Sequence, residues 1–160
     1  MDWLALSKTL ALCLLSIILE LFSYSKKGKA WFESLRQPKY SFPFSVWYLV
    51  GGLYYIICGI VAYRQFHHST QIFTAPIILL ASMMVLNGLP NFILFKLHSL
   101  KLFKWTFIPF IIVFIWLMIV LVHTDKISAG VAGIYFLWLG YDIYYFFELV
   151  KLNGDSSLKE

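Results

Sequence analysis

Charged residues are scarce in this sequence. Of its 160 residues only 13% are charged, whereas 61% are hydrophobic and 19% are aromatic. A soluble domain is roughly 25% charged and about 45–50% apolar, and a chain of this length has too little interior to hide so much apolar surface from water. The composition therefore excludes an ordinary soluble domain and indicates a protein that lies in lipid.

Residue sets that carry catalysis or hold a metal are also missing. The two cysteines, Cys13 and Cys58, lie in apolar runs and suggest neither a disulfide framework nor a metal site. No two histidines are spaced four residues apart on an expected helix. The sequence has no Ser/His/Asp set and no nucleotide-binding loop. It therefore predicts no catalytic residue, no metal site and no cofactor.

What the sequence has instead is a series of long apolar runs. A helix needs about 20 apolar residues to cross roughly 30 Å of hydrocarbon, and these runs lack the alternation and exceed the roughly 9–11 residues of a barrel strand. The first run has neither the basic start nor the small-residue end of a cleavable signal peptide. We expect an all-α membrane protein, a single transmembrane domain over 1–160, with five helices at about 3–24, 44–63, 71–95, 102–123 and 128–150.

Basic residues are concentrated in segments that a five-span bundle places on one face. These segments are the connection 25–43, the third connection and the polar tail 151–160. By the positive-inside rule, this face is cytoplasmic, so the N-terminus is expected outside and the C-terminus in the cytoplasm. Topology thus explains the net charge of +5 without a nucleic-acid partner. The basic face has Lys26, Lys27, Lys29, Arg36, Lys39, Lys96, Lys101, Lys104, Lys151 and Lys159, and the other face has Lys8, Arg64 and Lys126.

Four ordered stretches carry a family resemblance. The pattern W-[YF]-x-x-L-x-[KRQ]-P-x-[WY]-x-P-P is matched within WFESLRQPKYSFP, and V-W-x-x-L-Y-x-x-M-G is matched in part within VGGLYYIICG. VLNGLPNFILF and IYFLWLGYDIYYFFELVK follow at the spacing of L-N-x-x-W-x-x-x-F-F and P-Y-L-x-W-x-x-F-A-x-x-L-N. The matching residues are Trp31, Phe32, Leu35, Pro38, Tyr40, Pro43, Val50, Tyr55, Gly59, Leu86, Asn87, Phe95, Tyr135, Leu137 and Trp138. Over nearly its whole length the chain resembles the TspO/MBR family, the tryptophan-rich sensory proteins that include the mitochondrial translocator protein.

The resemblance implies a fold and a set of functions. It implies a five-helix membrane protein that binds hydrophobic planar ligands, porphyrin (tetrapyrrole) or sterol-like, and acts as sensor, transporter or regulator. A second reading is an enzyme for light-dependent porphyrin breakdown, which in the family involves pocket tryptophans. A third is an ion channel or transporter. The family occurs in bacterial and mitochondrial membranes, so the resemblance does not fix which membrane holds the chain.

Several positions depart from the family patterns. Gly51 and Pro90 stand where the second and third helices of the family have tryptophan, and Ile134, Phe42 and Phe146 replace two prolines and an asparagine. In the family, the second-helix tryptophan and the asparagine matching Asn87 lie near the ligand's polar groups. The tryptophan of this pair is absent here, so the identity of the family's ligand cannot be transferred to this chain.

Polar residues are expected to meet at one depth inside the bundle. Counted from the basic face at 1.5 Å per residue, Asn87 and Asp142 lie roughly 12 Å deep and Tyr55 roughly 16–18 Å deep. A carboxyl at that depth costs about 2.5–3.5 kcal/mol if it faces lipid. We therefore expect Asp142 to face the interior, with Asn87, Asn91 and tyrosines as hydrogen-bond partners. The predicted ligand-binding residues are Asn87, Trp138, Tyr135, Asp142, Tyr55, Trp31, Pro38, Asn91 and Gly51, with 25–43 as a lid.

Each of these signals also has a purely structural reading. Buried asparagines join helices, aromatics pack, and Gly52 and Gly59 allow close helix contact either within the bundle or in a homodimer. An ion channel would need several intramembrane ionisable groups. Only Asp142 is expected to lie deep, whereas Glu20 and Glu148 fall near the ends of their spans, which argues against a channel.

Overall fold

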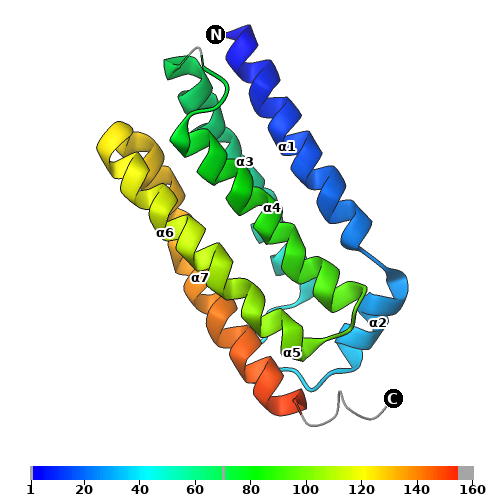
Figure 1. The fold of residues 1–160 in the computed structure, drawn as a ribbon. Helices are drawn as coiled ribbons and strands as arrows, with labels where there is room; N and C mark the ends of the chain where they lie inside the picture. Colours follow the sequence, from blue (N-terminus) through cyan, green and yellow to red (C-terminus); the bar gives the residue numbers. More distant parts are fainter. Residues whose placement is uncertain (1, 70, 155–160) are drawn as a thin grey trace.

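The computed structural model describes residues 2–69 and 71–154, and every regular element in these two ranges is a helix. This confirms the expected all-α class. Five helices are long and two are short, and the short 3₁₀ helix η1 joins α5 to α6 (Figure 1). The elements are α1 (Trp3–Ser23), α2 (Lys26–Ser34), α3 (Phe44–His68), α4 (Ala75–Phe95), α5 (Leu100–Phe103), η1 (Lys104–Thr106), α6 (Phe107–Thr124) and α7 (Lys126–Asn153).

Four helical stretches of the described chain are long and apolar enough to cross a membrane. They are α1, α3, α4 and the continuous stretch Leu100–Thr124. Helix α7 is the longest at 28 residues but is not one of these four. It carries Asp142 and several tyrosines. The structure thus supports an integral membrane protein, while the expected number of five spanning helices is not confirmed.

Three differences between the helix bounds and the sequence prediction matter for the site. Helix α3 continues to His68 rather than ending near residue 63. Helix α4 begins at Ala75 rather than near residue 71, because Pro76 sits in its first turn, where its missing N–H costs nothing. The connection 25–43 contains the nine-residue helix α2, which the search for long apolar runs did not find.

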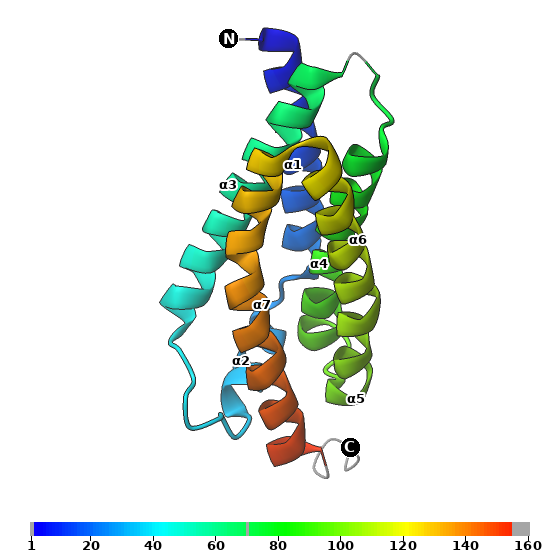
Figure 2. The same cartoon turned by 90° about the vertical axis from the view of Figure 1, so that its left-hand side faces the viewer.

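The long helices pack as a closed ring. Helix α1 packs between α3 and α4 (Figure 2). Helix α4 also packs against α6, α6 packs against α7, and α7 packs against α3, which closes the ring. One apolar cluster, including Cys58, Leu80 and Phe114, fills the half near the N-terminus. A second, including Phe103 and Leu149, fills the half near α2 and α5.

Helix α2 docks directly on the end of α4. A Cβ added at Gly28 would lie 2.1 Å from the carbonyl oxygen of Phe95 and 2.6 Å from its Cα, so only glycine permits this backbone contact. Ser25 completes the joint: its hydroxyl donates to the Phe95 carbonyl at 2.9 Å and accepts from the Gly28 N–H at 2.8 Å. The position of α2 is therefore fixed by α4.

An ion pair closes the opposite end of the bundle. Because α3 extends past residue 63, Arg64 reaches Asp125, the N-cap of α7, and donates from Nε at 2.8 Å and from Nη2 at 2.9 Å. The Ser128 hydroxyl donates to the same carboxylate at 2.6 Å. The Arg64 guanidinium holds the pKa of Asp125 well below its usual range, and hydrogen bonds from Ser128 lower this pKa further.

Candidate ligand-binding cavity

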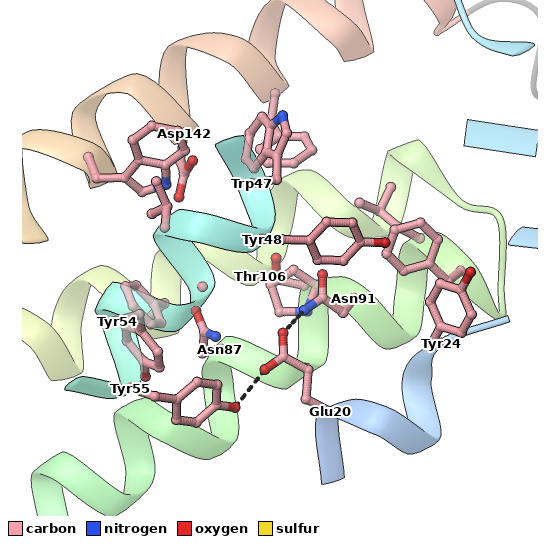
Figure 3. Close-up of a pocket in the computed structure, with 18 of the residues that line it drawn as sticks. Glu20, Tyr24, Trp47, Tyr48, Tyr54, Tyr55, Asn87, Asn91, Thr106 and Asp142 are labelled. Atoms are coloured by element: carbon pink, nitrogen blue, oxygen red, sulfur yellow. Dashed lines mark hydrogen bonds between the residues drawn. The ribbon is translucent and has the colours of Figure 1, made fainter. Parts of the chain in front are cut away.

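A cavity of about 640 Å³ lies inside the ring, on the side of the bundle where α2 packs (Figure 3). Its size falls within the roughly 300–1,000 Å³ of small-molecule sites. Both apolar clusters contribute to its walls, which are mainly aromatic and aliphatic. The aromatic lining residues are Tyr24, Phe32, Phe44, Trp47, Tyr48, Tyr54, Tyr55, Phe95, Phe103, Phe107, Phe110, Tyr135, Trp138 and Phe146.

Glu20 is the centre of a polar cluster in the cavity wall. The Tyr55 hydroxyl donates to Glu20 Oε2 at 2.6 Å, and the Asn91 amide donates to Glu20 Oε1 at 2.6 Å (Figure 3). The three side chains come from α3, α1 and α4, so this cluster joins three walls of the cavity. Sequence analysis placed Glu20 at the end of its span and did not include it in the site.

Asp142 reaches the cavity from α7, on the other side from Glu20 (Figure 3). Its Oδ1 atom is buried and has no hydrogen-bond partner among the described residues. The expectation that Asn91 and Tyr55 would pair with Asp142 is wrong, because both donate to Glu20 instead. Asp142 faces inward as expected and lines the cavity, with its buried Oδ1 atom unpaired among the described residues.

Seven of the nine predicted site residues lie in the cavity wall, and two do not. Trp31 stands on α2 with its ring 5.0 Å from that of His98. Pro38 is buried in the segment that follows α2, outside the wall. The seven residues brought together are Asn87, Trp138, Tyr135, Asp142, Tyr55, Asn91 and Gly51.

Two cavity positions lack the tryptophan of the family pattern, and at Gly51 the space is open. Gly51 and Pro90 both line the cavity, and a Cβ added at Gly51 would meet nothing within 4 Å. A different tryptophan occupies the neighbouring position: Trp47, one helical turn before Gly51, has its ring centroid 5.4 Å from that of Trp138. The spacing of four residues between Trp47 and Gly51 was the signal in the sequence that could have revealed this substitution.

The segment Leu35–Pro43, here called the strap, runs along α7. The Tyr145 hydroxyl donates to Gln37 Oε1 at 2.5 Å, and the Tyr141 hydroxyl donates to the Tyr40 carbonyl at 2.9 Å. The Phe42 ring lies 6.2 Å from Trp138, a residue of the cavity wall. These contacts hold the strap beside the site.

The polar groups of the cavity are suited to binding a ligand by hydrogen bonds. They include carboxyl oxygens, asparagine amides and tyrosine hydroxyls on mostly apolar walls, the usual composition of a small-molecule site. Among the residues described, no group of three His, Cys, Asp or Glu side chains is arranged to hold a metal ion.

Comparison with known proteins gives one family. The family model described as TspO/MBR matches residues 9–151, which is most of the chain. A search of curated proteins found no match. The matched region contains the whole cavity wall, from Ile17 to Phe146, and agrees with the all-helical fold. The chain belongs to the TspO/MBR family.

Proposed function

We propose that this protein binds a hydrophobic planar ligand, porphyrin or sterol-like, within the membrane and acts as a sensor, transporter or regulator. The observation that carries this proposal is the cavity of about 640 Å³ with aromatic walls and a few convergent polar groups. Flat apolar molecules gain most of their binding energy from such walls, and the polar groups fix their orientation. Family membership supports the same class of function.

The strap and α2 serve as the lid in this proposal. The strap is tied to α7, and α2 is tied to α4, so both lie against helices that line the cavity. A cover of this kind shields a bound ligand from water and slows its release.

The proposal includes five spanning helices and a cytoplasmic C-terminus. Helix α7 has 28 residues, which at 1.5 Å per residue is about 42 Å and longer than the hydrocarbon layer. Figure 1 places α2, α5 and the end of α7 together at one end of the bundle, where the basic residues are concentrated. Lys159 lies outside the described residues. Single-cysteine labelling of Lys126→Cys and Lys151→Cys in a variant without Cys13 and Cys58 tests this topology.

Titration with protoporphyrin and a sterol tests the binding function. We expect quenching of tryptophan fluorescence that saturates with one ligand per chain, because Trp47 and Trp138 line the cavity. Asn87→Ala and Asp142→Asn should weaken binding, whereas Glu148→Gln, outside the wall, should not. Unchanged binding of every tested porphyrin and sterol by both cavity variants would mean that the site is wrong.

One observation keeps an enzymatic function in view. The pair Trp47 and Trp138, 5.4 Å apart in the cavity wall, could take the place of the tryptophan pair that family members are thought to use in light-dependent porphyrin breakdown. Product analysis after illumination separates the two functions: a binder returns the porphyrin unchanged, whereas an enzyme yields products that disappear in Trp138→Phe.

A further inference from the structure

The ionisable side chains of the cavity wall are predominantly acidic. Apart from tyrosine hydroxyls, the wall contains two carboxyl groups, Glu20 and Asp142, and one amine, Lys29. The amine already has partners: Lys29 Nζ lies 3.8 Å from Glu33 Oε1 and 5.2 Å from the centroid of the Phe44 ring. The two carboxyl groups have no basic side chain opposite them in the wall. The cavity therefore lacks a counter-charge for its acids.

We propose that Glu20 and Asp142 make this cavity selective for a hydrophobic aromatic ligand that carries a protonated nitrogen. This inference rests on the proposed binding function and names the ligand class of the same site. A carboxylate in an apolar cavity is stabilised most by a cation that also donates hydrogen bonds. The cavity wall places no cation beside Glu20 and Asp142, so in this proposal the ligand provides it.

The acceptor geometry leaves room for such a ligand. Each carboxylate oxygen has two lone pairs. Each oxygen of Glu20 has a single donor among the described residues, Tyr55 or Asn91, so each can accept one more bond. Asp142 Oδ1 accepts none. Figure 3 shows Glu20 and Asp142 reaching the cavity from opposite sides, so a donor group can approach either one while the ligand's rings lie between them.

The aromatic walls favour the same ligand class. Tryptophan and tyrosine rings attract cations at their faces, by about 0.5–2 kcal/mol, and the wall contains Trp47, Trp138 and Tyr54 in addition to Tyr55. A ligand carboxylate in the same place would be repelled by Glu20 and Asp142, and it would have to point towards Lys29 instead. The aromatic walls and the two carboxyl groups therefore both favour a cationic ligand over an anionic one.

Three planar probes of nearly equal size test the proposal. They are 9-aminoacridine, which is cationic at neutral pH, neutral acridine, and anionic acridine-9-carboxylate. Binding is measured with the purified full chain in a non-ionic detergent, and protoporphyrin is titrated in parallel. We expect 9-aminoacridine to bind about tenfold more tightly than acridine and the carboxylate to bind most weakly. Glu20→Gln and Asp142→Asn should each reduce this preference. Glu148→Gln, outside the wall, should preserve both the preference and the affinity for acridine.

The outcomes separate this inference from the proposed function. If acridine and protoporphyrin bind but the charge preference is absent, or survives in the Glu20→Gln/Asp142→Asn double variant, the inference is overturned and the binding function stands. If 9-aminoacridine binds with the expected preference and protoporphyrin does not, the inference is supported and porphyrin is removed as a ligand. If no probe binds, both are overturned.

Discussion

The side chain of Asn153 forms hydrogen bonds with both the backbone N–H and the backbone carbonyl of Arg36. Asn153 Oδ1 accepts from the Arg36 N–H at 2.9 Å, and Asn153 Nδ2 donates to the Arg36 carbonyl at 2.9 Å. Asn153 is the last residue of α7 and is buried. Arg36 is the second residue of the strap. This pair therefore fixes the start of the strap to the end of the helix that carries Asp142.

Replacing this asparagine should free the strap. Asn153→Ala leaves both backbone groups of Arg36 without their partner, a loss of about 1–3 kcal/mol. We expect trypsin to cleave after Arg36 and Lys39 roughly tenfold faster, because cleavage follows the population of the open segment, and ligand release to accelerate. Mass spectrometry of the peptides measures this. Leu152→Ala, at an exposed neighbour, is the control, and equal cleavage in the two variants would contradict the role of Asn153.

Filling the space at Gly51 should block the cavity. The site of a Cβ at Gly51 has no neighbour within 4 Å, so Gly51→Trp can be accommodated by placing its ring in the cavity, and protoporphyrin affinity should fall about tenfold or more. Gly51→Ala should retain binding and stabilise the helix by about 0.5–1 kcal/mol.

Gly140→Trp is the matched control for Gly51→Trp. Gly140 is exposed on α7, lies outside the cavity wall, and also has open space at its Cβ. Undiminished protoporphyrin binding by Gly51→Trp, measured by calorimetry, would show that the ligand sits elsewhere.

The donors to Glu20 should contribute jointly to stability. Tyr55→Phe removes the 2.6 Å bond to Oε2 and Asn91→Ala removes the 2.6 Å bond to Oε1. We expect each to lower the unfolding free energy by about 1–3 kcal/mol, since hydrogen bonds to charged groups are stronger than neutral ones. The double variant should deviate from additivity because both donors act on one carboxyl group. Unfolding in a denaturing detergent measures this, with Tyr144→Phe, at an exposed position of α7 outside the cavity wall, as the control.

Asp125 should make stability depend on pH. Its folded pKa is lowered, with the Arg64 contact as the largest cause, so its contribution is full above the ordinary value of roughly 4 and is lost as pH falls below it. Asp125→Asn removes the ion pair, and its stability difference from the wild type should shrink in that acidic range. Asp125→Ala should cost about 1 kcal/mol more, because asparagine still caps a helix and alanine does not. A pH-independent difference would rule out the ion pair as the cause.

The sequence predicted the long helices well because hydropathy alone defines them. It missed α2, whose nine residues include three lysines and a glutamate, because a short charged helix gives no apolar run. The docking of α2 depends on Gly28 meeting the Phe95 backbone, a tertiary contact without a local signal. The sequence also could not predict that α3 extends to Arg64 and beyond, because the partner of Arg64, Asp125, comes from a distant segment.

The sequence predicted how deep the polar side chains of the site lie in the bundle, but not which of them form hydrogen bonds with each other. The cost of exposing a carboxyl to lipid correctly places Asp142 inside, and seven predicted residues reach the cavity wall. Counting from the end of α1 placed Glu20 at a boundary, because that count ignores α2, which continues the bundle beyond α1 (Figure 1). Which donors reach Glu20 rather than Asp142 depends on how α1, α3 and α4 are rotated, and no single helix sequence specifies that.

The backbone contact of Gly28 with Phe95 restricts how this protein can move. Two main chains in direct contact cannot slide past each other as flexible side chains do, so α2 and the end of α4 travel as one rigid piece. Any hinge for exchanging ligand must therefore lie beyond α2, in the strap itself, where Pro38 and Pro43 limit the rotations available to the chain.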